Sequence, residues 1–226
     1  KIEVKKASES AARELAADEW HWQIHAVRIR RKLVYVAMEQ QSRFVMVFWG
    51  LKKGDVQTLV ELFFERLLIL LSGQCAASGL LDEAVMAQAL CRLAEQQIHF
   101  TSGTDRSVQS HINEVIQTCR RAVDDCDCLP DNELEAAGFD KAQNGMIRSA
   151  RASDYFYPQE ELFCLWLRDY AAVDEAGIVR ARARCQEIRQ KAFGALVAQM
   201  NPPSGDEQVD AAVQELLAKL MKVADK

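Results

Sequence analysis

The sequence predicts an α+β fold in which an antiparallel sheet is packed by helices and followed by a C-terminal helical hairpin. Two apolar runs rich in β-branched and aromatic residues, 33–38 and 44–49, are joined by a short polar connector, which is typical of a β-hairpin. After residue 50 the apolar positions adopt helical spacing. Beyond about residue 174 no strand pattern occurs. Strands, helices, one further strand and more helices therefore follow one another in the order of an α+β domain.

Strands are expected mainly in the first quarter of the chain. Residues 2–4 alternate like a short strand, and residues 22–29 alternate like a half-buried one. Between them, residues 8–17 are rich in alanine and glutamate, which favours a helix. The uninterrupted apolar character of 33–38 and 44–49 predicts two fully buried strands at the centre of the sheet.

In the middle of the chain, the spacing of the apolar residues predicts helices and one short strand. A helix is expected from Val56 to about Gly73, where the glycine ends it. A second helix, from about Leu81 to Glu95, is expected to turn four residues inward, namely Val85, Met86, Ala89 and Leu93. The next elements are a strand at 98–100, a helix capped by Thr104 or Asp105 with apolar positions from Val108 to Cys119, and a helix that begins at Pro158.

Residues 124–140 differ from the rest of the chain because they include seven acidic residues and no basic one. We expect an irregular connector with a short helix here. Three roles are open for it: a cover over a basic part of the sheet, a solvated loop, or a surface that recognises a basic partner. Composition favours the solvated loop.

Two amphipathic helices separated by Pro202-Pro203-Ser204-Gly205 predict the C-terminal hairpin. The domain organisation expected from this is an α+β core domain over residues 1–172 and a helical extension over 173–226. Amphipathic helices must bury their apolar stripes, so the extension is a candidate interface for a protein partner or a second copy. Its candidate interface residues are Ile188, Leu196, Leu216 and Leu220.

Composition excludes several classes of protein. Of the 226 residues, 49% are hydrophobic and 27% charged, a balance that supports a packed core and excludes a disordered chain. The longest aliphatic stretch, 67–71, is too short to cross a bilayer, so no membrane partner is expected. The net charge of −5 shows that the molecule as a whole is not a polycation of the kind that binds nucleic acid non-specifically.

Cysteine and motif patterns predict neither a metal nor a cofactor. The seven cysteines are an odd number, and the closest pair, Cys126 and Cys128, has one intervening residue instead of the two of zinc turns. Phosphate-loop, dinucleotide-binding and nucleophile-elbow patterns are absent from the sequence. No secretion signal pattern follows Lys1, so a cytoplasmic location is expected.

Basic residues concentrate between His21 and Lys53, a segment that contains seven Lys and Arg residues and only one acidic residue, Glu39. On a strand, Arg28 and Arg30 would project to one face with Lys32 in the same alternation. Such a row could bind phosphates, although charges at a strand end also deter aggregation. The candidate nucleic-acid or anion-binding residues are Arg28, Arg30, Arg31 and Lys32.

Catalytic candidates are few. His21 and His25 would share a strand face about 13 Å apart, too far to bind one metal ion. His25, Asp105 and Arg106 would form an enzyme site only if the fold brought them into one pocket. Capping of a helix is the simpler role for Asp105.

An ordered set of motifs resembles a bacterial family of small proteins known only as a domain of unknown function. These motifs are Trp22-Gln23-Ile24-His25, Arg30-Arg31-Lys32, Phe48-Trp49-Gly50-Leu51-Lys52-Lys53-Gly54-Asp55, Thr104-Asp105-Arg106-Ser107-Val108 with Asn113-Glu114, and Tyr157-Pro158-Gln159-Glu160-Glu161-Leu162. The resemblance covers about residues 1–172 and implies bacterial origin and a compact α+β fold. It implies no activity.

Three functional hypotheses follow. The first is a non-enzymatic interaction or regulatory module, carried on a bacterial mobile element, that binds a protein partner or self-associates. The alternative is a nucleic-acid-binding protein that uses the basic segment 28–32. The third is a small enzyme with a site near His25, Asp105 and Arg106.

Overall fold

The computed structural model describes residues 3–4, 20–95, 98–103, 105–127, 130, 132–149 and 155–200. The predicted helix at 8–17, Thr104, and the second helix of the predicted hairpin with Leu216 and Leu220 lie outside these residues. By its internal contacts the chain divides into two compact units, Lys1–Arg182 and Ala183–Lys226, which are described separately.

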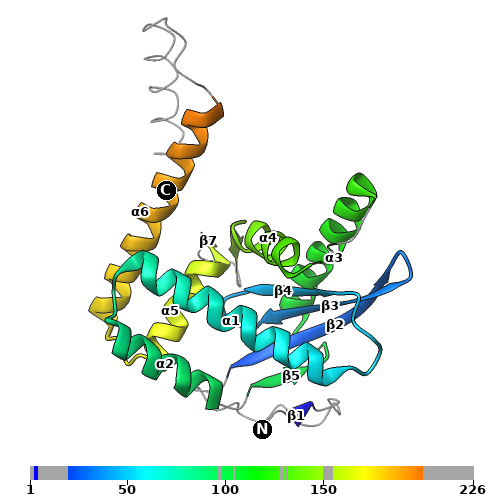
Figure 1. Ribbon diagram of the computed structural model, residues 1–226, viewed down its shortest axis with the longest axis horizontal. Helices are drawn as coiled ribbons and strands as arrows, with labels where there is room; N and C mark the ends of the chain where they lie inside the picture. Colours follow the sequence, from blue (N-terminus) through cyan, green and yellow to red (C-terminus); the bar gives the residue numbers. More distant parts are fainter. Residues whose placement is uncertain are drawn as a thin grey trace, which may run out of the picture. The chain divides into compact units, whose positions relative to one another are not determined.

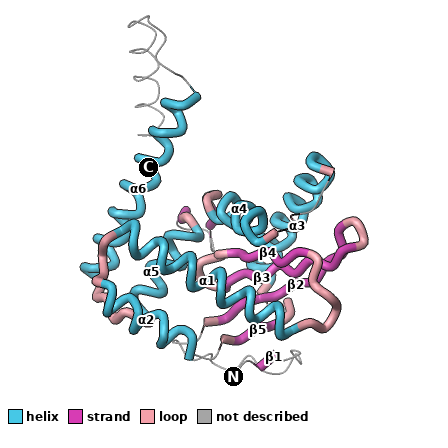
Figure 2. The backbone as a smooth tube through the Cα atoms, in the orientation of Figure 1, coloured by secondary structure: helices cyan, strands magenta, loops and turns pink. Residues whose placement is uncertain are grey.

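A five-stranded sheet organises the first unit, in the order β1-β5-β2-β3-β4 (Figures 1 and 2). Its strands are β1 (Glu3–Val4), β2 (His21–Ile29), β3 (Lys32–Glu39), β4 (Val45–Trp49) and β5 (His99–Thr101). The predicted antiparallel hairpin is confirmed, because β2, β3 and β4 pair antiparallel in sequence. The sheet is nevertheless mixed. β5 follows α1 and α2 in the chain and pairs parallel with β2, and β1 pairs parallel with β5. The predicted α+β class is confirmed.

The helices among the described residues are α1 (Val56–Ser78), α2 (Glu83–Glu95), α3 (Arg106–Cys126), α4 (Glu133–Asn144), α5 (Pro158–Asp169) and α6 (Glu175–Met200). A two-stranded sheet of β6 (Arg148–Ser149) and β7 (Tyr155–Phe156) completes them. Asp105 caps α3, and Pro158 stands in the first turn of α5, as the sequence predicts. Among the described residues, no helix is both long enough and apolar enough to cross a membrane.

Helices cover both faces of the sheet. In Figure 1, α1 crosses one face, whereas α3 packs on the other and α4 runs beside β4. Trp22 of β2 meets Phe63 of α1 edge to face, with ring centroids 4.7 Å apart. The opposite face forms one apolar cluster between β2, β3, β4 and α3, which contains Ile29, Val34, Val36, Met38, Val45, Val47, Val108, Ile112, Val115, Ile116, Cys119 and Val123.

Two local predictions are wrong, and a third is only partly confirmed. α1 does not end at Gly73 but continues to Ser78, because buried Cys75 extends its apolar face and Gly79, at φ 65°, closes the helix with an N–H bond to the Cys75 carbonyl. Val85 is 37% exposed, so α2 buries only its narrower stripe of Ala89 and Leu93. The acidic segment contains the predicted short helix, α4, which begins at Glu133, but its first residues belong to α3, which extends to Cys126.

Candidate functional site

The turn between β2 and β3 consists of Arg30 and Arg31 alone. Ile29 pairs with Lys32, and both arginines have positive φ angles, 44° and 68°. Positive φ at both central residues is the backbone of a type I′ turn, whose twist suits a tight hairpin. The alternation expected to place Arg28, Arg30 and Lys32 on one strand face therefore ends at Ile29.

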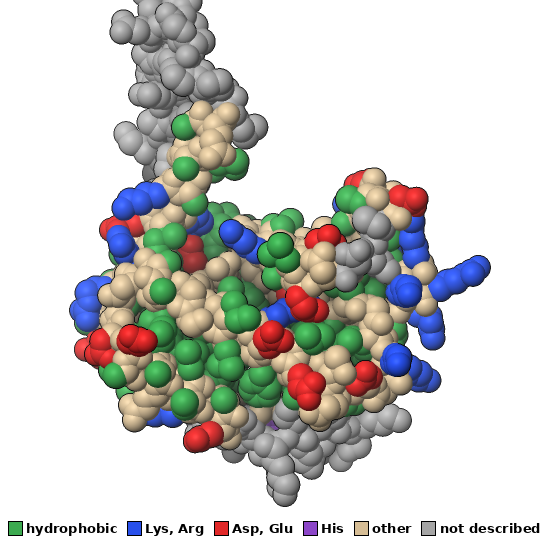
Figure 3. Space-filling model, viewed as in Figure 1, with side chains coloured by type: hydrophobic (Ala, Val, Ile, Leu, Met, Phe, Trp, Pro, Cys, Tyr) green, Lys and Arg blue, Asp and Glu red, His purple; other side chains and the backbone are tan. Residues whose placement is uncertain are grey.

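Basic residues gather at this end of the sheet. Arg28, Arg31 and Lys32 are exposed around the turn, and Lys52 and Lys53 are exposed in the loop after β4. That loop lies beside the start of β3, since the Gly50 N–H donates to the Leu33 carbonyl at 2.9 Å. Figure 3 shows the Lys and Arg side chains on this side of the molecule. We name the group the basic end and define it as Arg28, Arg30, Arg31, Lys32, Lys52 and Lys53.

Only the first part of the acidic segment contacts the basic end. Arg30 pairs with Asp127 and, at 3.6 Å, with Asp124. Among the described residues, no carboxylate forms an ion pair with Arg31 or Lys32. Two later acidic residues of the segment pair with α1 instead: the carboxylates of Glu133 and Asp140 lie 2.7 and 3.1 Å from the guanidinium of Arg66.

The start of α3 forms a separate polar network. The Asp105 carboxylate accepts hydrogen bonds from the N–H groups of Ser107 at 2.7 Å and Val108 at 3.2 Å. Burial acts to raise the pKa of Asp105, but these N–H donors, together with Gln40 and the charge of Arg43, lower it below the ordinary value. The carboxylate is therefore engaged as a helix cap.

No hydrogen bond or ion pair joins His25, Asp105 and Arg106 in the described part of the chain. His25 is half-buried on β2, opposite Val36, and Arg106 is exposed at the start of α3. The fold brings Asp105 beside Gln23, whose side-chain oxygen accepts from the Asp105 N–H at 3.3 Å. The enzyme hypothesis stays a prediction, and these contacts do not support it.

The candidate partner interface falls in the second unit. On α6, Ile188 is half-buried and Leu196 is 52% exposed. Two further exposed or half-exposed apolar positions on the same helix are Phe193 and Val197. The prediction of a partner interface stays open, because Leu216 and Leu220 lie outside the described residues.

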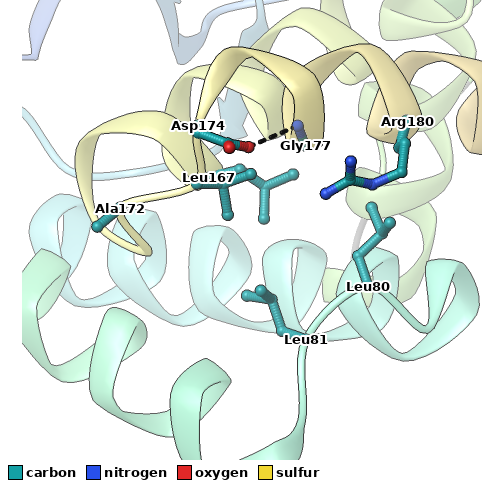
Figure 4. A pocket seen from close by; sticks show the side chains of 8 residues that line it. Leu80, Leu81, Leu167, Ala172, Asp174, Gly177 and Arg180 are labelled. Atoms are coloured by element: carbon teal, nitrogen blue, oxygen red, sulfur yellow. Dashed lines mark hydrogen bonds between the residues drawn. The ribbon is translucent and has the colours of Figure 1, made fainter.

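The first unit contains a cavity of about 370 Å³ that the sequence analysis does not predict. Figure 4 shows Leu80 and Leu81 on one side of it and Asp174, Gly177 and Arg180 on the other. Its carboxylate is already used, because Asp174 accepts from the Gly177 N–H at 2.8 Å at the start of α6. The remaining lining is mostly aliphatic, so this cavity offers no arrangement of groups for acid–base chemistry.

Gly177 is required by close packing beside this cavity. A Cβ atom at this position would lie 2.3 Å from Cγ1 of Val173. Because the valine side chain is short and branched, it cannot bend away, and either Val173 or the backbone would have to shift. We therefore expect Gly177→Ala to lower the free energy of unfolding by about 1–3 kcal/mol, measured by urea denaturation.

The matched control is Gly73→Ala, because Gly73 is inside α1 and a Cβ there meets nothing within 4 Å. This control should raise the free energy of unfolding by about 0.5–1 kcal/mol, since alanine favours a helix. Equal effects of the two substitutions would contradict the packing explanation.

Comparison with protein families places the chain in a known family. A family model described as a domain of unknown function, DUF6933, matches residues 1–161. No curated protein matches the chain. The match confirms the resemblance to a domain of unknown function that the ordered motifs predict.

Proposed function

Because the chain belongs to the DUF6933 family, whose function is unknown, its own geometry must carry the assignment, and we propose that it binds nucleic acid through the basic end. The observation that carries the proposal is the Arg30-Arg31 turn. A left-handed conformation costs an ordinary L-residue about 1–2 kcal/mol, and tight hairpin turns prefer Asn-Gly. Turn chemistry does not explain two arginines with positive φ, and strained residues cluster at ligand sites.

The distribution of charge supports phosphate binding. The basic end presents five cations outside the Arg30 ion pairs, namely Arg28, Arg31, Lys32, Lys52 and Lys53. Although the chain has a net charge of −5, these cations lie on one end of the sheet, where their fields add. Each phosphate contact releases counterions, so affinity should fall steeply with salt.

The test compares the protein with Arg31→Glu/Lys32→Glu in fluorescence-anisotropy titrations of a labelled oligonucleotide, single-stranded and duplex, over a series of salt concentrations. We expect the double variant to bind at least about tenfold more weakly at low salt. Its plot of log affinity against log salt should be shallower by about 1–2, because about two phosphate contacts are lost.

Two further variants keep the test specific. Lys141→Glu reverses one charge at an exposed position of α4, half the charge change of the double variant, and should leave binding within about twofold. Arg31→Gly removes one cation and relieves the positive φ, so it should bind more weakly while unfolding no more easily than the parent. Absence of binding by the parent protein at low salt, or equal salt slopes for the parent and the double variant, would refute the proposal.

The protein-partner hypothesis stays a prediction beside this one. Its support is the exposed apolar surface of α6 at Phe193 and Leu196, which are 46% and 52% exposed. An exposed apolar stripe favours an interface but does not say which molecule covers it.

A further inference from the structure

A second cavity, distinct from the basic end, has a volume of about 200 Å³. It is lined by residues of α3, by the end of α4 with the segment that follows it, and by β6 and β7. Its lining residues are His111, Glu114, Val115, Thr118, Gln143, Met146, Ile147, Arg148, Ser149 and Tyr155. None of the sequence-based hypotheses uses these residues.

The guanidinium of Arg148 is the unusual group in this cavity. Its side chain is only 6% exposed, and its Nε has no hydrogen-bond acceptor. The Nη1 atom lies 3.5 Å from Nδ1 of His111 and 3.8 Å from the carboxylate of Glu114, both long contacts. The ion pair with the exposed carboxylate of Glu114, at 3.8 Å, compensates this buried cation only weakly, so the site gains from an added anion.

Glu114 does not neutralise this charge well. Its side chain is 65% exposed, and its carboxylate lies nearer to Nδ1 of His111, at 3.3 Å. The other ring nitrogen of His111 donates to the Ser149 carbonyl at 3.1 Å, which fixes the imidazole between the two charges. Burial and the charge of Arg43 both lower the pKa of Arg148, and Glu114 only partly opposes them.

Exposed apolar side chains form the rim of the same cavity. Met146 is 49% exposed, Ile147 is 50% exposed and Tyr155 is 80% exposed. Single exposed apolar residues are common, but three large ones beside a buried cation form an amphipathic pocket. A ligand that fits has an anionic group for the interior and an apolar body for the rim.

We propose that this cavity binds a small monocarboxylate, whose carboxylate contacts the Arg148 guanidinium and whose apolar body packs against Met146, Ile147 and Tyr155. The planar guanidinium matches a carboxylate in shape and can bind both of its oxygens. The carboxylate of Glu114 lies at the same cavity and repels a doubly charged phosphate more than a singly charged acid.

The test is a titration of the full chain with benzoate, followed by the backbone amide signals in ¹H–¹⁵N NMR spectra. We expect saturable shifts confined to amides around the cavity, such as Val115, Ser149 and Tyr155, with a dissociation constant of about 1 mM, as suits a ligand of this size. Benzyl alcohol, which lacks the charge, should bind at least about tenfold more weakly. Phenyl phosphate should bind no more tightly than benzoate.

Variants connect the signal to the named residues. Arg148→Met should weaken benzoate binding by at least about tenfold. Tyr155→Ala, at an exposed position where folding is not at stake, should weaken it by about two- to fivefold. Leu134→Ala removes an 83% exposed leucine outside the cavity and should change nothing.

Three results would overturn the proposal: no saturable shift with benzoate, shifts that map away from the cavity, or equal binding of benzyl alcohol. Tighter binding of phenyl phosphate would refute the monocarboxylate assignment. None of these results depends on the basic end, so this proposal and the nucleic-acid proposal fail separately.

Discussion

Replacing Asn144 by alanine is expected to lower the free energy of unfolding by about 2–4 kcal/mol. Asn144 is 1% exposed on α4 and binds the outer edge of β4. Its side-chain oxygen accepts from the Val45 N–H at 2.8 Å, and its nitrogen donates to the Val45 carbonyl at 2.7 Å. Alanine would leave both groups of Val45 buried without partners, and each such loss costs about 1–3 kcal/mol.

The measurement is urea denaturation followed by circular dichroism, with Lys141→Ala as the control on the same helix. Lys141 is exposed, so its replacement should change the free energy of unfolding by no more than about 0.5 kcal/mol. If Asn144→Ala were as mild as the control, the edge of β4 could not depend on α4 for its hydrogen bonds.

Asp140 should make the stability of the protein fall as the pH rises from about 4 to about 7. It lies one helical turn before Asn144, where its carboxylate accepts from the Val47 N–H at 2.8 Å. Burial raises its pKa from the ordinary 3.8 to about 7, although the charge of Arg66 acts to lower it. The folded state therefore holds a proton that the unfolded chain has released in this range, so stability is highest below the range and is lost across it.

The comparison is between the protein and Asp140→Asn, by denaturation at a series of pH values from 4 to 8. Because asparagine does not titrate, the stability of the parent minus that of the variant should decrease through this range and level off above about pH 7. The difference isolates Asp140 from other groups such as Glu39, whose pKa burial also raises. A difference that is constant, or that increases with pH, would show that the Asp140 carboxylate is already ionised at low pH in the folded protein.

The edge of β4 shows why part of the fold escapes sequence patterns. The uninterrupted apolar runs of β3 and β4 and the buried face of α3 are local, so the sequence predicts them correctly. The acidic segment, by contrast, suggests a solvated loop. In the structure Asp140 and Asn144 are buried against β4, with Arg66 from α1 donating to the Val47 carbonyl at 2.8 Å. Nothing local distinguishes these polar residues from solvent-exposed ones.

The basic end was only partly predictable. Its residues stand out in the sequence as a cluster of charge, but the alternation suggested a continued strand instead of a turn. The usual Asn-Gly signal of a two-residue hairpin is missing. The short gap between the strand patterns 22–29 and 33–38 was the available clue. The contribution of Lys52 and Lys53 to the same surface depends on the pairing of β3 with β4.

The cavity around Arg148 could not be predicted from the sequence. Arg148 and Ile147 follow a helix, His111 lies more than thirty positions earlier, and no spacing connects them.

By itself the sequence determined the α+β class, the central hairpin, most helix faces and the clustering of positive charge, because periodicity and composition act over a few neighbouring residues. The tertiary structure alone decided which polar groups became buried and which charges became neighbours. Arg30 meets Asp124 and Asp127, Arg66 meets Asp140, and buried Arg148 has only a 3.8 Å contact with the exposed carboxylate of Glu114. The physical reason is that desolvation and pairing depend on residues brought together from distant parts of the chain, which no local pattern records.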